Sequence, residues 1–127
     1  MVSGVFDTSA VLAILQDEPG RAVAEKMLGG AAISTVNLAE LAAKLSDANF
    51  PDSKTMEYID GMSLSVVAFD MEYALVTGAL RAATRKFGLS LGDRACLATA
   101  RMLGVPAVTA DRSWAALDLG IDIRIIR

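Results

Sequence analysis

The stretch "GVFDTSAVLAIL" (Gly4–Leu15) contains a single charged residue, Asp7, with apolar residues on both sides. The short apolar run before Asp7 predicts a buried strand over residues 2–6, and the longer segment after it predicts a helix over residues 8–16. A strand that leads directly into a helix is typical of α/β domains. We therefore expect Asp7 at the carboxyl end of the first strand of such a domain.

The remaining sequence continues the alternation of strands and helices. Further strands are expected over residues 31–34, 64–69, 107–109 and 121–126, and further helices over residues 22–28, 34–47, 53–62, 70–87, 91–103 and 114–119. In the helix over residues 70–87, one face should carry Tyr73, Val76, Thr77, Leu80 and Thr84. We predict one α/β domain over residues 1–127, in which about five short strands form a mainly parallel sheet with helices on both faces.

The composition narrows the possible chemistry. The chain has no histidine and one cysteine, Cys96, which argues against a histidine base and against a zinc site of nitrogen and sulfur ligands. A lone cysteine favours a reducing compartment, and no segment resembles a secretory signal or a membrane span, so we expect a cytoplasmic protein. The net charge of −3 argues against nucleic-acid binding through a broad basic surface, although bound cations can supply positive charge to an acidic enzyme.

Four carboxylates stand out by their positions: Asp7, Glu40, Asp93 and Asp111. Asp7 and Asp111 each follow a predicted strand, and ligands of α/β sheets collect at the carboxyl ends of strands. Helix capping is the ordinary explanation for an aspartate before a helix, and a solvated helix face is the ordinary explanation for Glu40. However, Asp93 lies in line with the apolar side of its helix, and Glu40 lies among small and apolar residues, which favours burial.

Converging carboxylates repel one another unless a cation lies between them. Carboxylate oxygens suit hard cations, so the four acids predict a site for Mg²⁺ or Mn²⁺. The hydroxyl of Ser9 could support this site and Thr109 could orient Asp111, against the ordinary explanations of capping or local turn bonding for Ser9 and strand propensity for Thr109. Arg94 and Arg112 each adjoin a candidate ligand and could bind phosphates, against the ordinary explanation of a solvated surface.

Three segments together resemble a known family. They are "VFDTSAVLAIL" (residues 5–15), "STVNLAELAAKL" (residues 34–45) and "LSLGDRACLATARMLGVPAVTADRSWA" (residues 89–115). They are similar to the PIN-domain nucleases, and among these to the VapC-type toxins of bacterial toxin–antitoxin pairs. The resemblance extends from Asp7 to Trp114 and shows no departure at the four acidic positions.

This resemblance implies a metal-dependent endoribonuclease that uses Mg²⁺ or Mn²⁺. Asp7, Glu40, Asp93 and Asp111 would be its catalytic and metal-binding residues, with Ser9 and Thr109 in support. The substrates of such toxins are structured RNAs, often transfer or ribosomal RNA. The resemblance also implies a cytoplasmic homodimer that a small VapB-type antitoxin holds inactive.

Three other classes of protein remain open. A receiver-like signalling domain also gathers acids and Mg²⁺ at strand ends, but it needs a lysine at a late strand end, where this chain has none. A phosphohydrolase with an aspartate nucleophile needs a second aspartate at the position of Ser9. A catalytically inactive PIN scaffold that only binds partners is disfavoured by the intact acids.

Overall fold

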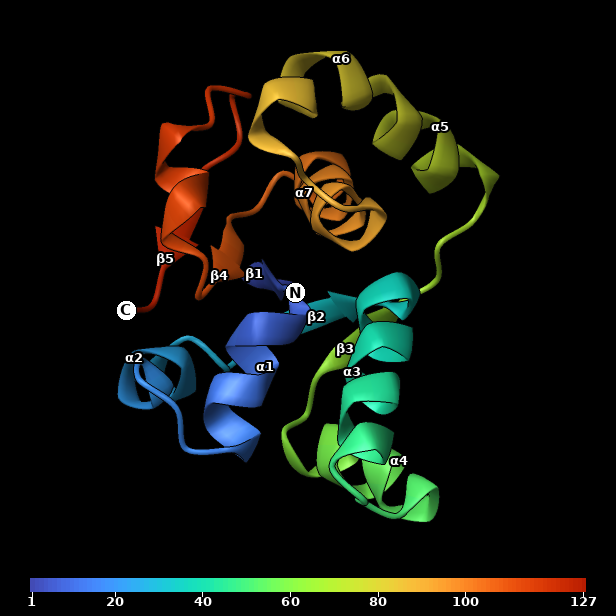
Figure 1. Ribbon diagram of the computed structural model, residues 1–127, viewed down its shortest axis with the longest axis vertical. Coiled ribbons are helices and arrows are strands. Elements are labelled where there is room, and N and C mark those ends of the chain that lie inside the picture. The colour runs from blue at the N-terminus through green and yellow to red at the C-terminus, as the bar shows by residue number, and fades with distance from the viewer.

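The computed structural model describes all 127 residues and contains one five-stranded sheet (Figure 1). The order of its strands across the sheet is β3-β2-β1-β4-β5, and every neighbouring pair is parallel. The strands are β1 (Gly4–Phe6), β2 (Ala31–Ser34), β3 (Ser65–Val67), β4 (Ala107–Thr109) and β5 (Ile123–Ile125). The predicted parallel sheet of about five short strands is therefore confirmed.

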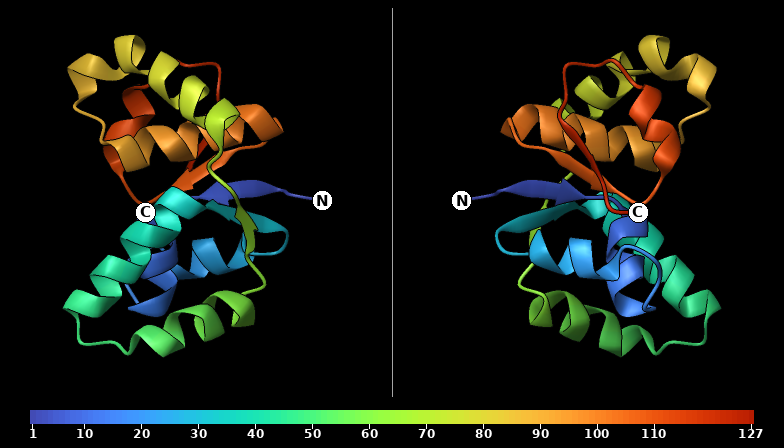
Figure 2. Two further views of the ribbon diagram at one scale, coloured as in Figure 1. Left: turned by 90° about the vertical axis from the view of Figure 1, so that its right-hand side faces the viewer. Right: turned by 90° about the vertical axis from the view of Figure 1, so that its left-hand side faces the viewer.

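Helices cover both faces of the sheet, as predicted (Figure 2). The first layer contains α1 (Thr8–Leu15), α2 (Arg21–Lys26), α3 (Thr35–Asp47) and α4 (Asp52–Gly61). The second contains α5 (Met71–Ala79), α6 (Arg81–Thr84) and α7 (Leu91–Leu103), with the 3₁₀ turns η1 (Arg85–Phe87) and η2 (Arg112–Ala116). None of these helices has the length and apolar character needed to cross a bilayer.

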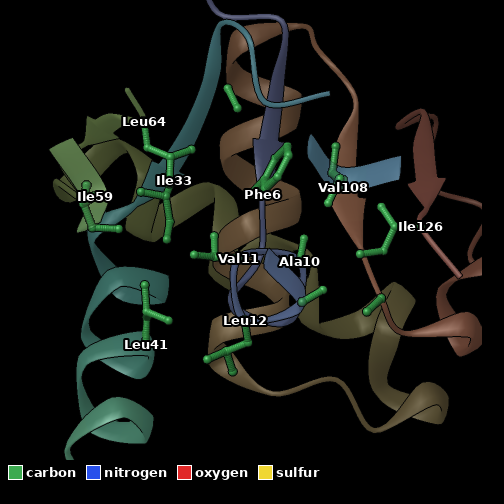
Figure 3. Close-up of a cluster of buried hydrophobic side chains, with 14 of the residues drawn as sticks. Phe6, Ala10, Val11, Leu12, Ile33, Leu41, Ile59, Leu64, Val108 and Ile126 are labelled. Carbon is green, nitrogen blue, oxygen red and sulfur yellow. The ribbon is translucent and has the colours of Figure 1, made fainter. Parts of the chain in front are cut away.

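The sheet separates two hydrophobic cores, because successive side chains of a strand point to opposite faces. Phe6, Ile33 and Val108 extend from three neighbouring strands into the larger core, where α1 and α3 contribute further apolar side chains (Figure 3). Val5 and Ala107 extend into the other core, beneath α7. Because helices cover both faces, the central strands are buried along their whole length rather than at alternate residues.

The helix predicted over residues 70–87 is broken into α5, α6 and η1. The residues predicted to share one face are nevertheless those that turn inward: Thr77, Leu80 and Thr84 are buried, and Tyr73 and Val76 are partly buried. The buried threonine hydroxyls are satisfied by the preceding turn: Thr77 donates to the carbonyl of Tyr73 at 2.7 Å and Thr84 to that of Leu80 at 2.8 Å. The helix predicted over residues 114–119 is likewise replaced by the shorter turn η2.

The chain changes direction across the sheet at β1. From β1 it proceeds to β2 and β3 on one side, and then returns to β4 and β5 on the other. Strands β1 and β4 are direct neighbours, with Val5 opposite Ala107 and Phe6 opposite Val108. Their carboxyl ends form the topological switch point, where α/β folds bind ligands. Asp7 directly follows β1 there, and Asp111 follows β4 by two residues.

Candidate functional site

A cavity of about 250 Å³ opens at this switch point, and its lining contains no hydrophobic residue. We call it the acidic cavity. The residues that line it are Asp7, Thr8, Ser9, Asn37, Glu40, Lys44, Ser90, Asp93 and Asp111. The structure thus brings the four predicted acids together from four separate segments of the chain, and Ser9 with them.

Asp7 is the most constrained of the four acids. It is almost fully buried and forms the N-cap of α1. Its Oδ1 accepts hydrogen bonds from the Ala10 amide at 2.9 Å and the Ser9 hydroxyl at 2.6 Å, and its Oδ2 accepts one from the Thr109 hydroxyl at 2.6 Å. Burial raises the pKa of Asp7, while the bonds from Ser9 and Thr109 oppose this shift because they stabilise the charged form.

The two hydroxyls that hold Asp7 are held in turn by the segment after β4. The Ala110 amide donates to the Ser9 hydroxyl at 2.9 Å, and the Asp111 amide donates to the Thr109 hydroxyl at 3.0 Å. Each hydroxyl therefore accepts from the backbone and directs its own proton to Asp7. Through this network the carboxyl end of β4 sets the position of the carboxylate that follows β1.

Glu40 is held through one of its two oxygens. It is half-buried on α3. The small and apolar residues of this helix had suggested burial on all sides, but its outer face is exposed to solvent. Its Oε1 accepts from the Thr8 hydroxyl at 2.9 Å and from the side-chain amide of Asn37 at 3.0 Å. Its Oε2 accepts no hydrogen bond from the protein.

Asp93 and Asp111 follow the same pattern. Asp93 forms a capping box with Ser90, in which only Oδ2 of the aspartate accepts, from the Ser90 amide at 3.0 Å. Asp111 caps η2, and only its Oδ1 accepts, from the amide and hydroxyl of Ser113. The capping explanation is therefore correct for both residues, yet each cap leaves one carboxylate oxygen free.

No cation of the protein neutralises the acidic cavity. The ion pairs of the structure all lie at the surface and join Arg21 to Asp17 and Glu25, Lys54 to Glu57, and Arg124 to Asp122. None of them includes Asp7, Glu40, Asp93 or Asp111. Lys44 is the one cationic residue in the lining, one helical turn beyond Glu40. Sequence reasoning missed Lys44, although its spacing of four residues from Glu40 was a usable signal.

The two predicted phosphate-binding arginines do not line the acidic cavity. Arg94 is half-buried, and its guanidinium donates to the carbonyl of Thr77 on α5 at 3.4 Å. Arg112 is exposed, and its Nε donates to the carbonyl of the last residue, Arg127, at 3.2 Å. Their binding of RNA stays a prediction, and the structure places both at the periphery of the site.

The donor atoms of the acidic cavity fit a hard divalent cation. They are carboxylate, hydroxyl and amide oxygens, the ligands that Mg²⁺ and Mn²⁺ prefer. The free oxygens of Glu40, Asp93 and Asp111, together with Asp7, are the groups that would hold it. The structure contains no group of three or more acidic or cysteine side chains that already surround one point. Binding of a cation would therefore draw the carboxylates closer together.

Cys96 lies beneath this site and should be chemically inert. It is fully buried on α7, and burial raises its pKa well above the ordinary value, an effect to which the charges of Asp7 and Asp93 add. Since the thiolate is the reactive form, we expect no reaction of the native protein with Ellman's reagent at neutral pH, and one thiol per chain after unfolding in guanidinium. Rapid reaction of the native protein would contradict the packing described here.

The chain is similar to several solved complexes. The DNA-bound VapBC complex of Salmonella typhimurium contains a chain with 22% identity and a TM-score of 0.74, and both chains are covered completely. VapBC2 of Rickettsia felis, bound to a promoter DNA fragment, gives 20% identity and a TM-score of 0.72 over 97% of each chain. At these identities the likeness shows the fold.

A further structure is VapBC-5 of Mycobacterium tuberculosis, described as a member of the VapBC family of toxin–antitoxin systems. It has 25% identity and a TM-score of 0.67, over 100% of this chain and 99% of that one. No functionally curated protein matches the chain. The family model of the PIN domain matches residues 4–119, which include all four of the segments that form the acidic cavity. The chain therefore belongs to the PIN-domain family.

Proposed function

We propose that this chain is a metal-dependent endoribonuclease and the toxin of a VapBC-type toxin–antitoxin pair, acting as a single PIN domain over residues 1–127. One observation carries the proposal: carboxylates from four segments border one polar cavity, and none of them is neutralised by an ion pair. An uncompensated cluster of this kind destabilises the fold unless it binds a cation. Membership of the PIN-domain family supports a nuclease, and the similarity to VapBC complexes supports a toxin.

Within this proposal the chain's own residues have distinct roles. A divalent cation bound by the four acids would activate a water molecule and stabilise negative charge on the scissile phosphate. Asp7 is the fixed ligand, because three donors hold its two oxygens. The free oxygens of Glu40, Asp93 and Asp111 would complete the set of ligands that holds the cation. The chain has no histidine to act as a base.

We further propose that the protein is a cytoplasmic homodimer whose cognate partner is a VapB-type antitoxin. The similar structures from Salmonella typhimurium and Rickettsia felis are described as VapBC complexes, which supports the antitoxin partner. In addition, a groove of about 770 Å³ between α1 and α4 offers an apolar surface to a partner, with Phe50 and Tyr58 in edge-to-face contact at 5.0 Å. An antitoxin-like reading frame is expected directly beside the gene. A gene without such a neighbour would argue against the toxin role, but not against the nuclease.

The proposal is tested by brief expression of the chain without its partner, followed by sequencing of RNA ends. Expression of the Glu40→Gln variant serves as the control, because this change removes one carboxylate and keeps the shape of the side chain. We expect new ends at discrete positions in structured RNA, with transfer or ribosomal RNA as the foremost candidates, and only with the parent chain. Identical RNA ends in both cultures would contradict nuclease activity and favour a PIN scaffold that only binds partners.

Lys44 is expected to bind a phosphate of the RNA substrate. It is exposed at the rim of the acidic cavity and forms no ion pair, so its ammonium group is available. Lys44→Ala should raise KM for RNA by about three- to tenfold and lower the salt dependence of binding by about one counterion, with kcat nearly unchanged. Lys54→Ala is the matched control, since Lys54 is an exposed lysine that lines the separate groove between α1 and α4. Equal KM values for both variants would contradict this role.

A further inference from the structure

Asn37 connects two helices at the acidic cavity. It is almost fully buried on α3, one turn before Glu40. Its Nδ2 donates to Oε1 of Glu40 at 3.0 Å and to the carbonyl of Gly92, in the first turn of α7, at 3.1 Å. Both partners are acceptors, so the amide can be oriented in only one way. Its Oδ1 is buried and has no hydrogen-bond partner, an arrangement that costs stability.

Gly92 provides the space into which Glu40 fits. A Cβ atom added at Gly92 would lie well inside the van der Waals radii of both carboxylate oxygens of Glu40. Gly92 lies inside a helix, where alanine is the more favourable residue. The carboxylate of Glu40, which packs against Gly92, therefore explains why a glycine occupies this position; the backbone conformation of α7 does not require one.

Thr8 completes the contacts of Glu40. Its hydroxyl lies 2.9 Å from Oε1 of Glu40 and 3.1 Å from the backbone carbonyl of Asn37. Thr8 of α1 and Asn37 of α3 thus both donate to Oε1 of Glu40, and Gly92 of α7 packs against the carboxylate. The side chain of Glu40 has little freedom to rotate, and Oε2 is the oxygen left without a protein donor.

We propose that Asn37 is a positioning residue, which together with the space at Gly92 fixes Glu40 so that its free oxygen is presented to the cation. This inference rests on the proposed function, in which Glu40 belongs to the cation site. Groups that orient metal ligands typically change metal affinity by about 10- to 100-fold when they are removed. The competing explanation is that Asn37 only ties α3 to α7 and stabilises the fold.

The two explanations are separated by measuring Mn²⁺ binding calorimetrically, together with kcat and KM for RNA. We expect Asn37→Ala to weaken Mn²⁺ binding by about tenfold or more and to lower kcat, with KM unchanged. Gly92→Ala should do the same, because its methyl group displaces the carboxylate. Thr84→Ala is the control: like Asn37→Ala it removes a buried side-chain donor that bonds to a backbone carbonyl, but in α6, away from the cavity. It should lower the melting temperature only.

A double-mutant cycle with Glu40→Ala gives the decisive result. If Asn37 acts through Glu40, then Asn37→Ala should change neither Mn²⁺ affinity nor kcat once Glu40 is already alanine. By the same reasoning, Gly92→Ala should raise the melting temperature in that background, since the clash is gone and the helix gains alanine. Circular dichroism melts of every variant establish that it is folded.

The possible outcomes distinguish this inference from the proposed function. A Glu40→Ala variant with unchanged Mn²⁺ binding and cleavage would overturn the proposed function, and the inference with it. If Glu40→Ala is impaired but folded Asn37→Ala and Gly92→Ala bind Mn²⁺ like the parent, the inference alone is overturned. An equal loss from Asn37→Ala with and without Glu40 would also overturn it, because the effect would then be structural.

Discussion

Asparagine in place of Asp93 is expected to abolish most RNA cleavage while leaving the protein folded. In the capping box, only Oδ2 of Asp93 accepts a hydrogen bond, from the Ser90 amide, and the carbonyl oxygen of asparagine can accept the same bond. The other oxygen, which is free in the parent, becomes an amide group that cannot bind a cation. Loss of one charged ligand should cost about 3–5 kcal/mol of transition-state stabilisation, which corresponds to roughly 10²–10⁴-fold in kcat/KM.

Asp70→Asn provides the matched control for this variant. Asp70 is also an aspartate at the start of a helix, where it accepts a hydrogen bond from the Tyr73 amide at 3.1 Å, but it does not line the acidic cavity. We expect this variant to cleave RNA at the parent rate. If Asp93→Asn also cleaves at that rate, with a melting temperature like that of the parent, Asp93 is only a helix cap and the proposed catalytic site is wrong.

Much of the fold and the positions of the acids could be predicted from the sequence. The strands could be predicted because both faces of a covered parallel sheet are buried, which produces short apolar runs such as residues 4–6 and 31–33. A charged residue at the end of such a run, like Asp7, then lies at the edge of the sheet where ligands bind. These signals are local, and they need no knowledge of how the helices pack.

The contacts that complete the site could not be predicted in this way. Asn37 and Gly92 are 55 residues apart and meet only because α3 packs beside α7. In the sequence each has an ordinary meaning, as a polar residue in a helix and a glycine after a turn. The same limit applies to Arg94, whose neighbour Asp93 suggested a role in the site. Packing against α5 instead directs its guanidinium to the carbonyl of Thr77.

Removal of divalent cations is also expected to abolish most RNA cleavage. The free oxygens of Glu40, Asp93 and Asp111 have no donor of the protein opposite them, and Lys44 alone lines the cavity with positive charge. Without a cation, these carboxylates would repel the phosphate of an RNA substrate. Lysine at one edge of the site cannot offset four negative charges, so both substrate binding and the chemical step should fail together.

The most direct test is cleavage of a structured RNA by the purified, partner-free protein before and after treatment with EDTA. Cleavage should fall to the background level of the Asp93→Asn variant, and should return when Mg²⁺ or Mn²⁺ is added in excess of the chelator. The Asp93→Asn variant should not recover under the same conditions, which excludes a contaminating nuclease. Undiminished cleavage in EDTA would contradict the central claim that the four carboxylates act by holding a cation.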